Sequence, residues 1–88
     1  MTTNVYPIEV VSEPSREISI TRQLASLARR EREVLHLLST GRPYKQIASE
    51  LELSIGTVRT YIRRLYAKLR VNCRTEAVVK YLTQQLDN

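Results

Sequence analysis

Five basic side chains crowd one stretch of this 88-residue chain without an acidic neighbour. The segment LSIGTVRTYIRRLYAKLRV, residues 53–71, contains no Asp or Glu but holds Arg59, Arg63, Arg64, Lys68 and Arg70. A helix that merely faces water usually pairs each base with an acid three or four residues away. Unpaired cations repel one another, so this pattern indicates a surface that binds a polyanion.

The distribution of charge over the whole chain supports this interpretation. The net charge is +5, and residues 42–74 alone carry +6, because eight bases there face only Glu50 and Glu52. The flanking parts of the chain nearly cancel. A mixed solvated surface normally intersperses both signs, so a clustered excess of this kind favours nucleic acid as the partner.

The apolar residues of the same stretch recur at helical spacing. At 100° per residue they fall on one side and predict a core-facing stripe formed by Ile55, Val58, Ile62, Leu65 and Leu69. The basic residues and two small ones, Gly56 and Thr60, lie on the other side. A DNA major groove about 12 Å wide admits one α-helix, and an arginine fork matches guanine O6 and N7. We therefore expect the basic side of this helix to contact DNA.

Composition and patterning predict an all-α fold of four helices. The ranges are 23–39, 43–51, 55–69 and a fourth helix from about residue 75, with Ser54 as N-cap of the third. Pro7 and Pro14 interrupt any helical period near the start. We expect residues 1–20 to form a flexible arm or linker and residues 21–88 to form one small domain.

The two middle helices and their short turn predict a helix-turn-helix, in which the first helix crosses the DNA backbone and the second reads bases. Phosphate contacts are expected from the start of each helix and from the flank of the second. The predicted phosphate-binding residues are Lys45, Ser54, Thr57, Tyr61, Arg64 and Lys68.

From LASLARREREVL to RTEAV the sequence resembles the LuxR/NarL-type (GerE-like) helix-turn-helix domain of bacterial transcriptional regulators. The matching motifs are REREVL, Gly41, KQIA, LELS, TVR, KLRV and RTEAV, in the order of the family. The resemblance implies a four-helix domain that binds double-stranded DNA as a dimer, with Arg59, Thr60 and Arg63 facing the bases. It also implies that the fourth helix forms the dimer contact, for which Val79 and Thr83 point outward, whereas Val78, Leu82 and Leu86 are expected in the core.

Two departures from the family pattern concern stability. Ala28 replaces the threonine cap of the first helix, so we expect that helix to begin earlier. Glu52 replaces a glycine in the turn, which costs about 1 kcal/mol of folding stability if its backbone is left-handed. Two further departures concern DNA contacts: Pro43 and Tyr44 replace a polar pair, and Tyr61 replaces a histidine.

Other functions find less support in the sequence. Region 4 of a sigma factor is the nearest alternative, although the RTEAV helix argues against it, and a protein-interaction module is another. We expect no enzyme, catalytic residue, metal site or cofactor, because the sequence has no glycine-rich phosphate loop and no metal-ligand spacing, and it contains only one His and one Asp. The expected location is the cytoplasm with no membrane association, and RNA polymerase is a candidate further partner.

Overall fold

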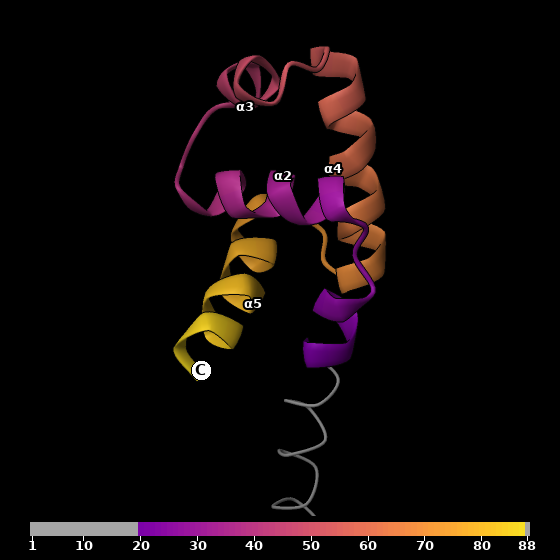
Figure 1. Cartoon of the computed structure of the whole chain (residues 1–88). Helices are drawn as coiled ribbons and strands as arrows, with labels where there is room; N and C mark the ends of the chain where they lie inside the picture. Colours follow the sequence, from indigo (N-terminus) through magenta and orange to yellow (C-terminus); the bar gives the residue numbers. More distant parts are fainter. Residues whose placement is uncertain (1–19, 88) are drawn as a thin grey trace, which may run out of the picture.

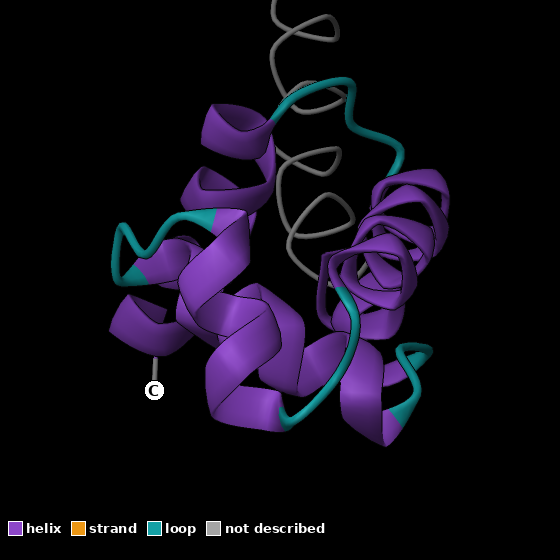
Figure 2. Cartoon of the chain, turned by 90° about the horizontal axis from the view of Figure 1, so that it is seen from above, coloured by secondary structure: helices purple, strands orange, loops and turns teal. Residues whose placement is uncertain are grey.

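The computed structural model describes residues 20–87, and all secondary structure in that range is helical (Figures 1 and 2). The labelled helices are α2 (Arg29–Ser39), α3 (Tyr44–Leu51), α4 (Ile55–Leu69) and α5 (Arg74–Asp87). Residues 20–25 are also helical. Apart from residue 20, the predicted N-terminal arm lies outside the described residues. Within the described part of the chain, no helix is long and apolar enough to cross a bilayer.

The helix predicted over 23–39 is wrong, because the structure breaks it at residues 26–28. The Ser26 hydroxyl donates to the Gln23 carbonyl at 2.6 Å, which ends the first helical segment. Ala28 then takes an extended conformation and caps α2, and its N–H donates to the Glu31 carboxylate at 2.9 Å. Glu31 thus supplies half of a capping box that alanine cannot complete. The helix therefore starts at Arg29 instead of earlier.

The turn between α3 and α4 has the form that the sequence predicts. Glu52 caps α3 in the left-handed conformation, with φ 58° and ψ 45°. Ser54 caps α4, since its Oγ accepts the Thr57 N–H at 3.0 Å. The predicted bounds of α4 are confirmed. This tight turn fixes the angle at which α4 leaves α3.

The core forms where α2 packs against both α4 and α5, while α3 covers one end of α4 (Figure 1). Its largest fully buried side chains come from α2, α3 and α4, and are Val34, Leu35, Leu38, Ile47, Val58, Leu65 and Leu69. The packing holds α4 by one side and leaves the opposite side free. This arrangement exposes the basic face of α4.

Besides its apolar packing, α5 makes polar contacts to the other elements through two cations. The Arg74 guanidinium donates to the carbonyls of Leu38 and Arg42, at 2.9 and 2.6 Å, and so satisfies backbone acceptors where α2 ends. Lys80 donates to the Leu69 carbonyl and to the Gln23 side chain. The expectation that Leu82 belongs to the core is wrong, because its exposed fraction is 44%.

Candidate nucleic-acid interface

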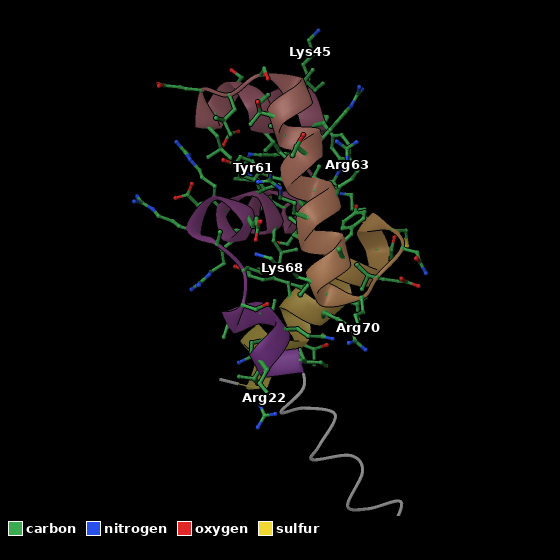
Figure 3. All side chains as sticks on the ribbon, turned by 90° about the vertical axis from the view of Figure 1, so that its right-hand side faces the viewer. Arg22, Lys45, Tyr61, Arg63, Lys68 and Arg70 are labelled. Carbon is green, nitrogen blue, oxygen red and sulfur yellow. The ribbon has the colours of Figure 1, made fainter. Side chains whose placement is uncertain are left out.

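The outward face of α4 presents arginines that no acid neutralises. Arg59, Arg63 and Arg64 are exposed, and within residues 20–87 none of them forms an ion pair. Arg63 projects from the side of α4 that faces away from α2 (Figure 3). The half-buried Thr60 lies beside it: its hydroxyl donates to the Gly56 carbonyl at 3.1 Å, and Arg63 approaches the hydroxyl at 3.4 Å. The three base-reading residues predicted from the sequence therefore share one accessible face.

Three arginines elsewhere in the described chain contrast with these. Arg29 and Arg30 both pair with Glu33, at 3.3 and 2.9 Å, and Arg42 pairs with Glu50 at 2.6 Å. The hydrogen bond from Arg42 lowers the pKa of Glu50. These three arginines are neutralised, whereas Arg59, Arg63 and Arg64 on the outward side of α4 have no acidic partner among the described residues, so that side carries a cluster of uncompensated positive charge.

The beginning of α4 offers further groups to an anion. Its first turn contains no acidic residue, and the N–H groups of Ile55 and Gly56 have no intrahelical acceptor. The hydroxyls of Ser54 and Thr57 bond to each other at 2.9 Å, so both stay close to the helix end. Lys45, in the first turn of α3, is exposed and extends beyond the same end of the domain (Figure 3). These positions suit contacts to phosphate.

Lys68 and Tyr61 are placed less favourably for the phosphate contacts expected of them. Lys68 donates to Glu31 at 2.8 Å and to the Ser26 carbonyl at 3.3 Å, which ties α4 to the start of α2. Burial alone would raise the pKa of Glu31, but hydrogen bonds from Lys68 and from the Ala28 N–H, with the charges of Lys68 and Arg64, hold it below its usual value. The Tyr61 ring is half-buried against the core. Lys68 therefore has a structural partner, and only the part of the Tyr61 side chain that the core leaves uncovered is accessible to DNA.

Two residues to which the sequence analysis gave no positioning role, Arg74 and Tyr44, hold α3 against the rest of the domain. Arg74 binds the α2–α3 connection and stacks over the Tyr44 ring, with its guanidinium carbon 6.0 Å from the ring centre. Tyr44 opens α3, the helix that carries Lys45. The RTEAV motif contains Arg74, but nothing in a single sequence shows that its guanidinium faces inward.

The prediction that Ile55 belongs to the core stripe is wrong. Its exposed fraction is 39%, whereas Val58, one turn further along α4, is fully buried. The buried residues of α4 begin at Val58, at the end of its first turn. Ile55 therefore lies at the rim of the basic face.

A second accessible surface lies on α5. Val79 is 56% exposed and Leu82 is 44% exposed, while Thr83 is half-buried. Val79 points outward as expected. The apolar part of this surface includes Leu82, which the sequence reasoning assigned to the interior.

Comparison with known proteins agrees with this geometry. The family model described as bacterial regulatory proteins, luxR family, matches residues 25–81. A probable transcriptional regulatory protein NarL of Mycobacterium tuberculosis is 43% identical over 60 residues, which cover 68% of this chain and 28% of that protein.

Two further relatives give a similar result. The nitrate/nitrite response regulator protein NarP of Escherichia coli is 46% identical over 59 residues, covering 67% of this chain and 27% of NarP. The transcriptional regulatory protein DesR of Bacillus subtilis is 46% identical over 54 residues, covering 61% and 27%. The chain therefore matches less than a third of the length of each of these curated relatives.

Proposed function

The chain belongs to the luxR family of bacterial regulatory proteins, and we propose that it regulates transcription by binding double-stranded DNA in a sequence-specific manner. Helix α4 enters the major groove, and α3 lies across the backbone. Arg59, Thr60 and Arg63 read base edges, while the start of α4 and Lys45 hold phosphates. The bacterial cytoplasm, where the genomic DNA lies, is the proposed place of action.

The observation that carries this proposal is the accessible, unneutralised face of α4. Three arginines stand there without acidic partners among the described residues. Their mutual repulsion is relieved when phosphates and guanine edges surround them. Relatives that are named transcriptional regulators or response regulators support the same function.

Two further parts of the proposal concern partners. We propose that two copies pair on DNA through α5, using Val79, Leu82 and Thr83, because one helix covers too few base pairs to specify a genomic site. RNA polymerase is a further candidate partner, since a transcriptional regulator acts at promoters.

Salt titration of DNA binding tests the main proposal. Each lost phosphate contact flattens the slope of log affinity against log salt by about 0.9. Lys45→Ala should flatten the slope and weaken all sequences alike, whereas Arg59→Ala and Arg63→Ala should each cost about 1–3 kcal/mol and relax preference at one base pair. The matched control is Arg29→Ala, which removes the same charge from an exposed arginine of α2 that pairs with Glu33.

Affinity that does not change with salt would contradict the proposal and favour a protein-interaction module. Arginine variants that lose affinity uniformly while keeping sequence preference would show that other residues read the bases.

A further inference from the structure

Ile55 is a large apolar side chain that the fold covers only in part. It is the first residue of α4, and 39% of its surface is exposed. Helix stability does not explain an isoleucine at this position, because a β-branched residue is a weak helix former and the first turn of a helix favours acidic side chains. Core packing does not explain it either, since the buried stripe of α4 begins at Val58.

The surroundings of Ile55 suit a surface that contacts the edges of DNA bases. Arg59 follows four residues later, so the two side chains lie about 40° apart on the helix and share one face. The next residue, Gly56, has open space where a side chain would be: an added Cβ would approach only Ser54 Oγ, at 3.9 Å. A flat surface can thus approach the backbone between Ile55 and Arg59.

Resting on the DNA binding proposed above, we infer that Ile55 is a specificity-determining residue that packs on the 5-methyl group of thymine. Among the groups displayed in the major groove, this methyl is the apolar one, and apolar side chains read it by contact. Closing the contact removes apolar surface of both partners from water.

The helix geometry also sets where the thymine lies. Ile55 and Arg59 are separated by about 6 Å along the helix axis, at 1.5 Å per residue. Bases are stacked about 3.4 Å apart along one strand. The thymine is therefore expected about two base pairs from the guanine that Arg59 contacts.

Thymine-to-uracil replacement tests the inference, because it removes only the methyl group. A preferred duplex is first selected from random DNA by the 88-residue chain. Each thymine of the selected half-site is then replaced singly by uracil, and affinity is measured for the wild type, Ile55→Ala and Arg63→Ala. We expect one replacement to weaken the wild type by about 3- to 10-fold, the range for one or two buried carbon groups. Ile55→Ala should reduce this ratio below about twofold, while Arg63→Ala, which alters a guanine reader, should keep it.

Three results would overturn the inference. One is a selected half-site in which no uracil replacement weakens the wild type, and another is a uracil effect that persists undiminished in Ile55→Ala. A selection that enriches no sequence would overturn both this inference and the proposed function, so the two failures are distinguishable. Helical circular dichroism and an unchanged salt slope for Ile55→Ala show that the variant is folded and keeps its phosphate contacts.

Discussion

The Nζ atom of Lys68, near the end of α4, lies 2.8 Å from Oε1 of Glu31, in the first turn of α2. Glu31 is only 3% exposed, and its second partner is the N–H of Ala28. The ion pair therefore joins α4 to the carboxylate that accepts the N–H of Ala28, the N-cap of α2. It gives Lys68 a role in stability that its position in a basic run does not indicate.

We expect Lys68→Met to lower the free energy of unfolding by about 1–3 kcal/mol, because it leaves the buried carboxylate of Glu31 without its cation. The salt slope of DNA binding should stay at the wild-type value. The matched control is Arg64→Met, which should flatten the slope by about 0.9 with little loss of stability. Urea unfolding and salt titration measure the two quantities. If Lys68→Met instead flattened the salt slope and kept wild-type stability, the result would contradict this prediction and support the phosphate contact expected from the sequence.

The lowered pKa of Glu31 predicts how stability depends on pH. A carboxyl group with a lower pKa in the folded than in the unfolded state stabilises the fold above the unfolded pKa. That contribution is lost as the pH falls through the folded pKa. We expect the wild type to lose stability between about pH 5 and pH 3, and Glu31→Gln to lose less over the same window. Urea unfolding at stepped pH checks this, and equal pH dependence of the two proteins would contradict it.

The left-handed backbone of Glu52 predicts a stabilising substitution. Glycine adopts this conformation without the steric penalty of a Cβ, so Glu52→Gly should raise the free energy of unfolding by about 0.5–1 kcal/mol. Glu52→Ala keeps the Cβ and should give no comparable gain, which makes it the matched control. Thermal and urea unfolding would show the difference. Equal effects of the two substitutions would mean that the lost carboxylate, not the backbone, matters.

The hydroxyl of Tyr66 is buried and makes no hydrogen bond of standard geometry within the described residues, although the Tyr44 side chain lies close enough to affect its titration. Burial also raises the pKa of Tyr66 above its usual range. Removing an unsatisfied polar group is neutral or favourable, so Tyr66→Phe should leave stability unchanged or raise it by up to about 1.5 kcal/mol. Tyr61→Phe, at a half-buried ring on the same helix, is the control and should stay within about 0.5 kcal/mol. A clear loss of stability in Tyr66→Phe would reveal a bound partner, such as water, at this hydroxyl.

The apolar surface of α5 is small. The area that its few side chains can bury is far below the roughly 1,200 Å² of a stable interface. We therefore expect a monomer or weak dimer in free solution and a dimer on paired half-sites. Val79→Glu and Leu82→Glu should leave the fold intact, because both side chains are exposed. Each should weaken binding to a paired site much more than to a single half-site, as electrophoretic mobility shifts can measure. Equal losses on the two DNAs would exclude α5 as the dimer contact.

The sequence predicts best what depends on local periodicity. Helix α4 has an uninterrupted apolar stripe and a serine cap, so its bounds and its basic face could be predicted. The break before α2 could not be predicted, because it depends on the hydrogen bond that the Ala28 N–H donates to the Glu31 carboxylate. Ile55 and Leu82 were misplaced for a related reason. A helical wheel shows which side is apolar, but packing by other elements decides how far along the helix that side is covered.

The contact between Lys80 and Gln23 has a consequence for synthesis on the ribosome. The two residues are separated by 57 positions, and Lys80 also binds the end of α4. At about 5–20 residues per second, roughly 3–11 s pass between translation of Gln23 and of its partner. During that interval residues 20–25 have been synthesised, but α5, which they contact in the folded domain, has not. Final docking of that segment therefore waits until α5 has been synthesised and has left the exit tunnel.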